Sequence, residues 1–469
     1  MANPEMTSTR CGATTYGRWM DDWWLAPFRD VFDGRRVVLA GDVAAAWTEH
    51  IALLRSVGAT DLMVVATTGR GVGALPDLPT VFVEPPDGLS FLERIHFGTD
   101  ALEHPPDHVL AALDRFDPTG EALVIGTFLN TATELGGRPF LASRRPEWVE
   151  LEDKVVIDAF WDRADIERSP SVVVDLADAW SAGEQVNLGD GTVWAADARD
   201  GFTGGGSGIR WVTDAGTRDR ALADLGPICD RVRVMPFLDG IPCSIHGIVL
   251  PDGVVALRPV ELITLRRGND FVYAGCATFW DPPDAVREQM RTIARRVGRQ
   301  LEAEVEFRGT FTVDGVVTDA GFLPTELNPR FGAGIMTIAR AAGLPIVLMN
   351  DLIVAGHDLD STAADIEAQL VDAADRYRGG GTWVSGVAGA PALAGDQLVI
   401  REGEFHRMAP GDTAAATVTG GGEFVRCRYQ PGAVPIGPST GPLAAAFWRF
   451  ADRELGTAVG PLTSAPDRS

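Results

Sequence analysis

Lysine is almost absent from this chain of 469 residues. Lysine and arginine together number 41, yet the sequence contains a single lysine, Lys154. The 65 acidic residues outnumber these bases and give a formal net charge of −24. That charge disfavours nucleic acid and anionic membrane surfaces as partners. A coding bias toward arginine accounts for the shortage itself, so the informative point is where the one lysine lies.

Cysteine and long apolar runs are scarce as well. The five cysteines, scattered from Cys11 to Cys427, show no Cys-x-x-Cys spacing, and the seven histidines form no metal-binding pattern. We therefore expect reduced thiols and no zinc site. No run of 18 apolar residues occurs, and the N-terminus lacks the pattern of a signal peptide. These absences predict a cytoplasmic protein.

Several common nucleotide-binding and hydrolase motifs are missing. Lys154 is followed by Val155, so the chain has no Walker A loop, and no lysine lies in a Val-Ala-x-Lys strand of the kinase type. Ser207 lacks a glycine two residues later, which excludes a Gly-x-Ser-x-Gly elbow. Residues 69–73 (Gly-Arg-Gly-Val-Gly) follow a strand but lack the acid of a dinucleotide fingerprint. We interpret them as a loop and leave contact with a substrate open.

The composition indicates a multidomain chain of mixed α/β (α+β) class. At 45% hydrophobic residues, the sequence is long enough for two or three domains with their own cores. Short apolar strands at 36–41, 62–66 and 122–126 alternate with helical segments, which predicts a parallel α/β layer. We assign this layer to an N-terminal domain of residues 1–128.

Two further domains are expected. Residues 129–375 form the core, with a small lobe at about 150–240 and a large lobe at about 241–375. Residues 376–381 (Arg-Tyr-Arg-Gly-Gly-Gly) are the clearest linker in the chain. After it, short strands alternate with turns rich in glycine, proline and alanine, which predicts a small β-rich C-terminal domain, 380–469.

The most informative segment is an expected β-hairpin at residues 309–327. Its two arms are rich in β-branched and aromatic residues, and residues 318–321 (Thr-Asp-Ala-Gly) have the composition of a turn. Because strands rise about 3.3 Å per residue, Asp314 and Glu326 should lie beside each other on the paired strands. Mg²⁺ commonly takes one or two carboxylates together with phosphate oxygens. The alternative is a solvated hairpin whose acids face water.

The residues that follow Glu326 strengthen the case for a phosphate site. Asn328, two residues further along an extended segment, points to the same side and offers a carbonyl oxygen. Arg330 then supplies a planar cation with five N–H donors that suits phosphate or carboxylate. The two acids and the carboxamide can hold Mg²⁺ against a nucleoside triphosphate, while the arginine is the cation that faces the transferred phosphoryl group.

The single lysine lies at the start of a segment with helical periodicity. Lys154 follows two acids, Glu152 and Asp153, and precedes an apolar stretch. A compact ammonium on a flexible stem suits a mobile polyphosphate better than a guanidinium does. We therefore interpret Lys154 as a phosphate ligand, and an ordinary surface lysine is the alternative.

Two weaker signals lie between Lys154 and the hairpin. The glycine-rich element at 200–209 includes Gly204, Gly205, Gly206, Ser207 and Gly208. Glycines let backbone N–H groups approach phosphate oxygens, and such a loop can act as a lid. Residues 232–240 then form an extended segment with a proline, which could act as a hinge whose backbone hydrogen-bonds an adenine edge.

Taken in order, these motifs resemble the ATP-grasp superfamily. The resemblance runs through Asp153-Lys154, residues 204–208, residues 235–240, Asp314 and residues 326–330, and covers roughly residues 125–360. It implies an ATP-grasp fold with a Rossmann-like domain before it and a C-terminal cap after it. Within the superfamily, the chain looks most like the pheganomycin-type peptide ligases of actinobacteria.

The resemblance also implies roles for individual residues. ATP would lie between two lobes, with Lys154 on its phosphates, the glycine loop closing over them, and the hinge at Met235, Phe237 and Leu238 holding adenine. Asp314, Glu326 and Asn328 would bind two Mg²⁺ ions, or Mn²⁺ in their place. Arg330 would stabilise the transferred phosphate or an acyl-phosphate.

Two features depart from the superfamily pattern. The expected strand before the glycine loop, residues 192–197, carries no second phosphate lysine, and Ile241-Pro242 stands where many members have a ribose-binding acid. Another cation would have to replace the missing lysine, and the candidates are Arg199, Arg258, Arg266 and Arg267.

The resulting hypothesis is an ATP-dependent carboxylate–amine ligase. A carboxylate would attack MgATP to give an acyl-phosphate, and an amine would then form an amide or peptide bond with release of ADP and phosphate. The partners would be small-molecule acids and amines, without nucleic acid or membrane, and a homodimer is compatible with this function. A phosphotransferase and a non-catalytic ATP-binding regulatory protein are the alternatives.

Overall fold

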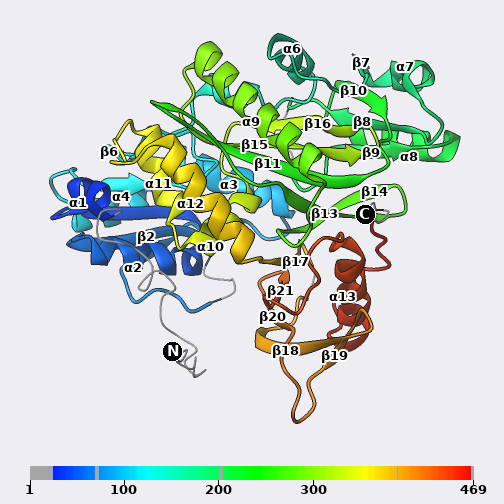
Figure 1. Ribbon diagram of the computed structural model, residues 1–469. Helices are drawn as coiled ribbons and strands as arrows, with labels where there is room; N and C mark the ends of the chain where they lie inside the picture. The colour runs from blue at the N-terminus through cyan, green and yellow to red at the C-terminus, as the bar shows by residue number, and fades with distance from the viewer. Residues whose placement is uncertain (1–24, 69–72, 200–203, 388, 466–469) are drawn as a thin grey trace, which may run out of the picture.

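The computed structural model describes residues 25–68, 73–199, 204–387 and 389–465. Cys11, most of the loop at 69–73 and residues 200–203 of the glycine-rich element lie outside these ranges. The described chain forms three sheets: one of four strands, one of fifteen and a two-stranded ribbon. Figure 1 shows the four-stranded layer at one side, beside the helices that lead out of the large sheet.

The N-terminal layer is a parallel sheet with strand order β3-β2-β1-β4. Val37 and Leu39 of β1 face one hydrophobic core, whereas Val38 and Ala40 face another. Both faces of the sheet are thus buried, as is usual for parallel strands. The predicted alternation of strands and helices is confirmed. The elements are α1 (Ala26–Phe32), β1 (Arg36–Val43), α2 (Thr48–Ser56), β2 (Asp61–Thr68), β3 (Thr80–Phe82), α3 (Phe91–Glu103), α4 (Asp107–Phe116) and β4 (Leu123–Ile125).

A small antiparallel lobe follows. Its strands pair in the order β7-β10-β8-β9, and the helices α7 and α8 share a core with them that contains the fully buried Trp194. The elements of this region are β5 (Glu134–Leu135), β6 (Arg138–Pro139), α5 (Pro146–Glu150), α6 (Ile157–Arg163), β7 (Val172–Asp175), α7 (Ala179–Val186), β8 (Thr192–Ala196), β9 (Ile209–Val212), α8 (Ala215–Leu225) and β10 (Arg231–Pro236).

The large sheet carries the expected hairpin at one edge, in the order β16-β15-β11-β13-β14-β17-β21-β20-β18-β19. The amphipathic helix α9 packs on β11 and β12. The elements are β11 (Ile241–Leu250), β12 (Gly253–Ala256), β13 (Val260–Arg267), β14 (Asp270–Ala277), α9 (Asp284–Val305), β15 (Gly309–Thr318), β16 (Gly321–Asn328), α10 (Ala333–Ala342), α11 (Ile346–Val354) and α12 (Ala363–Arg376).

The same sheet continues into the C-terminal segment. That segment contains β17 (Gly380–Ser385), β18 (Leu393–Arg401), β19 (Glu404–Arg407), β20 (Ala416–Gly421), β21 (Phe424–Tyr429) and α13 (Gly441–Glu454). Helix α13 shares a core with Ile263 and Leu265 of β13. The buried carboxylate of Glu261, also on β13, accepts hydrogen bonds from the Thr440 and Gly441 amides at the start of this helix.

The glycines predicted to form a linker have a packing role instead. Gly380 begins β17, which pairs with both β14 and β21. A Cβ at Gly380 would come within 2.5 Å of Ala277 Cα, and a Cβ at Gly381 within 2.2 Å of the Cys427 carbonyl oxygen. Close strand packing, rather than flexibility, therefore explains why glycine is needed here. Only residues 377–379 separate α12 from the sheet.

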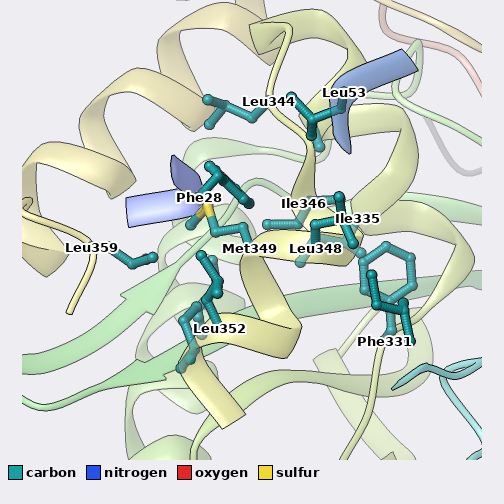
Figure 2. Close-up of a cluster of buried hydrophobic side chains, with 14 of the residues drawn as sticks. Phe28, Leu53, Phe331, Ile335, Leu344, Ile346, Leu348, Met349, Leu352 and Leu359 are labelled. Carbon is teal, nitrogen blue, oxygen red and sulfur yellow. The ribbon is translucent and has the colours of Figure 1, made fainter. Parts of the chain in front are cut away.

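A hydrophobic cluster joins the N-terminal layer to the helices that follow the hairpin. Phe28 of α1 and Leu53 of α2 belong to the same core as Ile335 of α10 and Met349 of α11 (Figure 2). Phe331 lies at the edge of this cluster, one residue after Arg330. The packing fixes the start of α10, and with it the exit of the hairpin, against a separate layer of the protein.

No single helix in the described ranges is long and apolar enough to cross a membrane. Only α10 and α11 taken together pass on length and composition, and they are bent by 112° relative to each other.

Candidate active site

A cavity of about 1600 Å³ lies between the N-terminal layer, the small lobe and the large sheet. The C-terminal segment adds part of its lining through β21 and the turn before it. The cavity collects nearly all the predicted site residues, namely Lys154, Gly204, Gly205, Gly206, Gly208, Met235, Phe237, Leu238, Asp314, Glu326, Asn328 and Arg330. Ser207 is the exception, because it does not line the cavity and its hydroxyl donates to the Gly204 carbonyl at 2.9 Å.

The two acids of the hairpin face each other as the sequence predicts. Asp314 on β15 and Glu326 on β16 are directly paired residues of the antiparallel ladder. The register shifts immediately after this pair, since Gly315 pairs with Pro324 and Thr325 is left over. Such a bulge bends the strand locally and redirects side chains. Thr325 instead donates its hydroxyl to the Asp314 carbonyl at 3.2 Å.

Asp314 is held from two sides. The Ser244 hydroxyl donates to its Oδ1 atom, and the Asn328 amide donates to Oδ2 at 3.1 Å. Burial, and secondarily the negative charge of Glu326, raise the pKa of Asp314 to about 7. The raised value reflects two carboxylates that lie close together in a poorly hydrated place, which is an environment that favours a bound cation.

Ser244 was not anticipated from the sequence. It lies on β11 opposite Asp314, 70 positions away along the chain. No local motif marks it, because its contact depends on the pairing of two strands that are distant in sequence.

Two predicted cations flank the acids. Lys154 is buried, with 7% of its surface exposed, and its Nζ atom lies 3.3 Å from Glu326 Oε1. It precedes α6, in the short connection after α5. Arg330 donates from Nε to Glu152 Oε1 at 2.9 Å and from Nη2 to Asn328 Oδ1 at 2.7 Å. Burial of Lys154 excludes the alternative of an ordinary surface lysine.

Arg330 is fixed by a small network. Glu152 also accepts from Arg144, so one carboxylate orients two guanidinium groups. Arg330 lies over the ring of Phe128, 5.5 Å from its centroid. Asn328 bridges the arrangement, because its amide nitrogen contacts Asp314 and its amide oxygen accepts from Arg330. The guanidinium therefore has a defined place beside the acids.

The donor set fits a hard divalent cation. Asp314, Glu326 and Asn328 present carboxylate and amide oxygens, which Mg²⁺ prefers, and Mg²⁺ characteristically uses few protein carboxylates. Among the residues with described positions, no group of three or more His, Cys, Asp or Glu is placed to hold a metal. A site with two carboxylates would therefore depend on phosphate oxygens and water for its remaining ligands.

Phe237 and Arg266 also line the cavity, whereas the ring that stacks on Phe237 does not. Trp211 of β9 and Phe237 are stacked, with centroids 4.3 Å apart, and the Arg266 guanidinium lies 5.3 Å and 5.8 Å from the two rings. Phe237 follows the end of β10, and its N–H donates to the Gly191 carbonyl at 3.0 Å. The predicted hinge thus lies in the cavity wall, but one of its amides already has a partner.

The four arginines considered as substitutes for a second lysine separate clearly. Arg258 is fully buried in ion pairs with Asp281 and Asp375, and Arg199 pairs with Asp230. Neither of them lines the cavity, nor does Arg267, whereas Arg266 does. Arg266 is therefore the one of the four that is placed to face a ligand there.

His246 and two glycines form a close contact that sequence reasoning missed. A Cβ at Gly334 would come within 2.2 Å of His246 Nε2, and one at Gly332 within 2.3 Å of Thr312 Oγ1. Burial lowers the pKa of His246 to about 3, so the ring is neutral, and its Nδ1 atom lies 2.9 Å from Thr312 Oγ1. The glycines let α10 start directly against β11 and β15, which brings the helix N-terminus to the cavity.

Comparisons with protein families and curated sequences give matches over parts of the chain. Residues 199–334 match the family described as the ATP-grasp domain. Over 227 residues the chain is 21% identical to the arginine-specific large chain of carbamoyl phosphate synthase from Geobacillus stearothermophilus, which covers 48% of this chain and 21% of that protein. Over 173 residues it is 31% identical to imidazole glycerol phosphate synthase subunit HisF from Beutenbergia cavernae, which covers 35% of this chain and 62% of that protein. The chain thus spans only part of each relative.

A solved structure with a similar fold covers almost the whole chain. It is the biotin carboxylase domain dimer of the 2-oxoglutarate carboxylase of Hydrogenobacter thermophilus, in complex with MgADP, ADP and bicarbonate. The TM-score is 0.54, at 13% sequence identity, over 92% of this chain and 91% of that one. At this identity the likeness concerns the arrangement of the elements.

Proposed function

We propose that this chain, an ATP-grasp superfamily protein with the ATP-grasp fold, is an ATP-dependent carboxylate–amine ligase. The observation that carries the proposal is the pairing of Asp314 with Glu326, flanked by Lys154 and Arg330 in one wall of a large cavity. Such a wall supplies both the acids that hold a metal–phosphate complex and the cations that neutralise charge during phosphoryl transfer.

The reaction would proceed in two steps. A carboxylate oxygen of the acid substrate attacks the γ-phosphorus of ATP, the bond to the β–γ bridging oxygen breaks, and ADP leaves. The nitrogen of an amine then attacks the acyl carbon of the acyl-phosphate, phosphate leaves with the bonding electrons, and the nitrogen loses a proton. The products are an amide, ADP and phosphate. Positioning and charge neutralisation supply most of the acceleration in such transfers.

Individual residues have distinct parts in this scheme. Asp314, Glu326 and Asn328 would hold Mg²⁺, or Mn²⁺ in its place, and the bound metal would neutralise phosphate charge. Arg330, already held by Glu152 and Asn328, would face the transferred phosphoryl group. Lys154 would exchange its contact with Glu326 for one with the ATP phosphates. In the ligand-free arrangement these cations balance the acids that later receive the metal.

The nucleotide would occupy the side of the cavity formed by the small lobe. Gly205 and Gly206 have φ angles of +67° and +85°, which glycine adopts readily, and together with Gly204 and Gly208 they would cover the phosphates. Adenine would lie near Met235 and Phe237, with the Leu238 backbone as its hydrogen-bond partner. Arg266 would take the place of the missing second lysine.

The finer assignments rest on the sequence. We propose that the acid and the amine are amino acids or short peptides, as in pheganomycin-type ligases. We also propose the division into units of residues 1–128, 129–375 and 380–469. The C-terminal unit would share its core with β13, so it would act as a fixed wall of the cavity.

The direct test is incubation of the full chain with ATP, Mg²⁺ and pooled amino acids and short peptides, followed by mass spectrometry and nucleotide analysis. The proposal expects Mg²⁺-dependent ADP and phosphate together with a condensed product. Formation of AMP would contradict the acyl-phosphate step. ADP with a phosphorylated acid, unchanged by added amines, would support the phosphotransferase.

The absence of a lysine on β8 favours a second candidate, a regulatory protein that binds ATP without turnover. The described β8 strand, Thr192–Ala196, carries no cation. Retained ATP binding with no product from any acid and amine pair would support this candidate.

A further inference from the structure

Three arginines gather at a part of the cavity that the proposed reaction does not use. Arg340 lies on α10, and Arg426 and Arg428 lie on β21 in the C-terminal segment. All three line the cavity, as does Glu49 of α2, which is the nearby acid. The N-terminal layer, helix α10 and the C-terminal segment thus meet at this part of the cavity, and the three arginines are called the arginine cluster below.

The β21 strand explains why its two arginines face the same way. Val425, Cys427 and Tyr429 point into the core beneath α13, so the alternate residues Arg426 and Arg428 point to the opposite face. Arg428 pairs with Gly381 on one side and Thr417 on the other. These small neighbours leave the guanidinium uncovered toward the cavity.

The cluster lacks the acids that balance arginines elsewhere in the C-terminal segment. Arg401 pairs with Asp412 at 2.7 Å, and Arg449 pairs with Glu404 at 2.7 Å. By contrast, the side chains of Arg340, Arg426 and Arg428 form no hydrogen bond or ion pair with any residue that the structure describes. Glu423, at the turn before β21, is engaged by Arg94 of α3.

Crowding of positive charge lowers the pKa values of the two arginines on β21. Burial, followed by the charges of Arg428 and Arg340, lowers the pKa of Arg426 to about 10, and Glu49 opposes the shift. Burial and Arg340 likewise lower the pKa of Arg428, again against Glu49. Three cations with one acid nearby cost folding free energy unless an anion joins them.

The distance along α10 between the hairpin end of the cavity and the arginine cluster limits the size of the molecule that carries the anion. Helix α10 begins at Ala333, three residues after Arg330, and Arg340 is seven residues further on. With a rise of about 1.5 Å per residue, these two positions on the helix are separated by roughly 10 Å. Ala333, Met336 and Arg340 line the cavity along one face of α10. One small molecule can therefore extend from the hairpin acids to the arginine cluster.

We propose that the acid substrate carries a second anionic group, a carboxylate or a phosphate, and that Arg340, Arg426 and Arg428 bind this group while its other carboxylate is activated beside Arg330. This assignment rests on the proposed function. Guanidinium groups bind both anion types through paired N–H donors, so the shared chemistry is a planar or tetrahedral oxyanion. Specificity for the acid would then come from residues about two helical turns along α10 from its start beside Arg330.

The experiment measures binding to the full chain by calorimetry at low ionic strength, without requiring turnover. The probes are straight-chain dicarboxylates from succinate to suberate, ω-phosphono acids of the same lengths, and matched monocarboxylates. The variants are Arg340→Gln and the double variant Arg426→Gln/Arg428→Gln. Arg401→Gln and Arg449→Gln are matched controls, because they remove exposed, ion-paired arginines of the same segment.

The proposal expects the wild-type protein to bind one chain length of a doubly anionic acid roughly tenfold more tightly than the monocarboxylate. The preference should disappear in the double variant, weaken in Arg340→Gln and persist in both controls. Whether the dicarboxylate or the phosphono acid binds better identifies the second group. Equal binding of singly and doubly charged acids, or a preference that survives the double variant, overturns the proposal.

ATP binding, measured separately, distinguishes this proposal from the proposed function. If the arginine variants lose ATP affinity as much as Arg266→Gln does, the cluster belongs to the nucleotide and the proposal is overturned. If the wild-type protein fails to bind ATP at all yet keeps the arginine-dependent preference, the proposed ligase activity fails while the anion site stands.

Discussion

The two ends of the cavity differ in how their charged side chains are paired. At the hairpin end, Lys154 lies beside Glu326, and Arg330 joins Glu152 to Asn328, which in turn contacts Asp314. At the other end, Arg426 and Arg428 lie near Arg340, and Glu49 is the acid that opposes their positive charge. The first region is balanced without a ligand, and the second has an excess of positive charge.

Because their charge balance differs, the two regions suit ligands of different charge. A balanced set has to exchange partners: a metal–phosphate complex brings both signs of charge, so the acids and the cations can be satisfied together. An unbalanced set has to acquire an anion, and a metal complex would add little. The hairpin end is thus suited to MgATP, and the arginine cluster to a free anionic group.

Removing one charge from the balanced end should have the largest effect on turnover. Glu326→Gln keeps the size of the side chain but leaves one carboxylate for the metal and leaves Lys154 without its partner. We expect the kcat for ADP release to fall by about a thousandfold or more. Glu404→Gln, an exposed acid paired with Arg449, is the control. Substantial turnover by Glu326→Gln would rule out the metal assignment.

Removing the guanidinium that faces the acids should have the next largest effect. Arg330→Gln loses the contacts with Glu152 and Asn328, whereas Arg144 keeps its own contact with Glu152. Loss of charge stabilisation during transfer should lower kcat by about a hundredfold, with a smaller change in the ATP KM. Steady-state kinetics at varied ATP separates the two constants. A change confined to KM would make Arg330 a binding residue only.

Much of the hairpin end could be predicted from sequence because its geometry is local. A short turn between β-rich arms places Asp314 opposite Glu326, and the period of two in an extended strand places Asn328 with them. Ser244 and His246 escaped prediction because they reach the site through the pairing of β11 with β15. The arginine cluster escaped for the same reason, since it joins α10 to β21.

The glycines at 380 and 381 show how local composition misleads. Three glycines in a row are typical of a linker, but at these positions strand packing leaves no room for a Cβ. The roles of Lys154, the glycine turn and the hinge stay predictions, and so do the boundaries of the domains.

A small cavity that also reaches Arg330 contains a buried acid with one unpaired carboxylate oxygen. Asp351 lines it together with Thr310 and Arg330, and its Oδ2 atom is buried without a partner among the described residues. Burial raises the pKa of Asp351 from 3.8 to about 8. Between these two values the folded protein keeps a proton that the unfolded chain has released, so stability falls as pH rises.

Asp351→Asn should remove that dependence. The wild-type free energy of unfolding should decrease by up to about 1.4 kcal/mol per pH unit between pH 5 and 8 from this group, and the variant should show a flatter profile. Urea unfolding at several pH values measures the difference. Parallel profiles for the two proteins would show that Asp351 is charged in the folded state, and that this small cavity is balanced after all.

The smallest expected effect concerns the one lysine of the chain. Lys154→Ala removes a buried ammonium from Glu326 and from the proposed phosphate position, so the ATP KM should rise by roughly tenfold with a modest change in kcat. Lys154→Arg sharpens the test. With 7% of Lys154 exposed, the site has little room for a planar guanidinium, and arginine should not restore the wild-type KM. Full activity of Lys154→Arg would mean that only charge is required there, and that the single lysine carries no geometric information. If Lys154→Arg is instead as impaired as Lys154→Ala, the balanced end requires a compact cation. The cluster at the other end differs in this respect, because it is built from guanidinium groups.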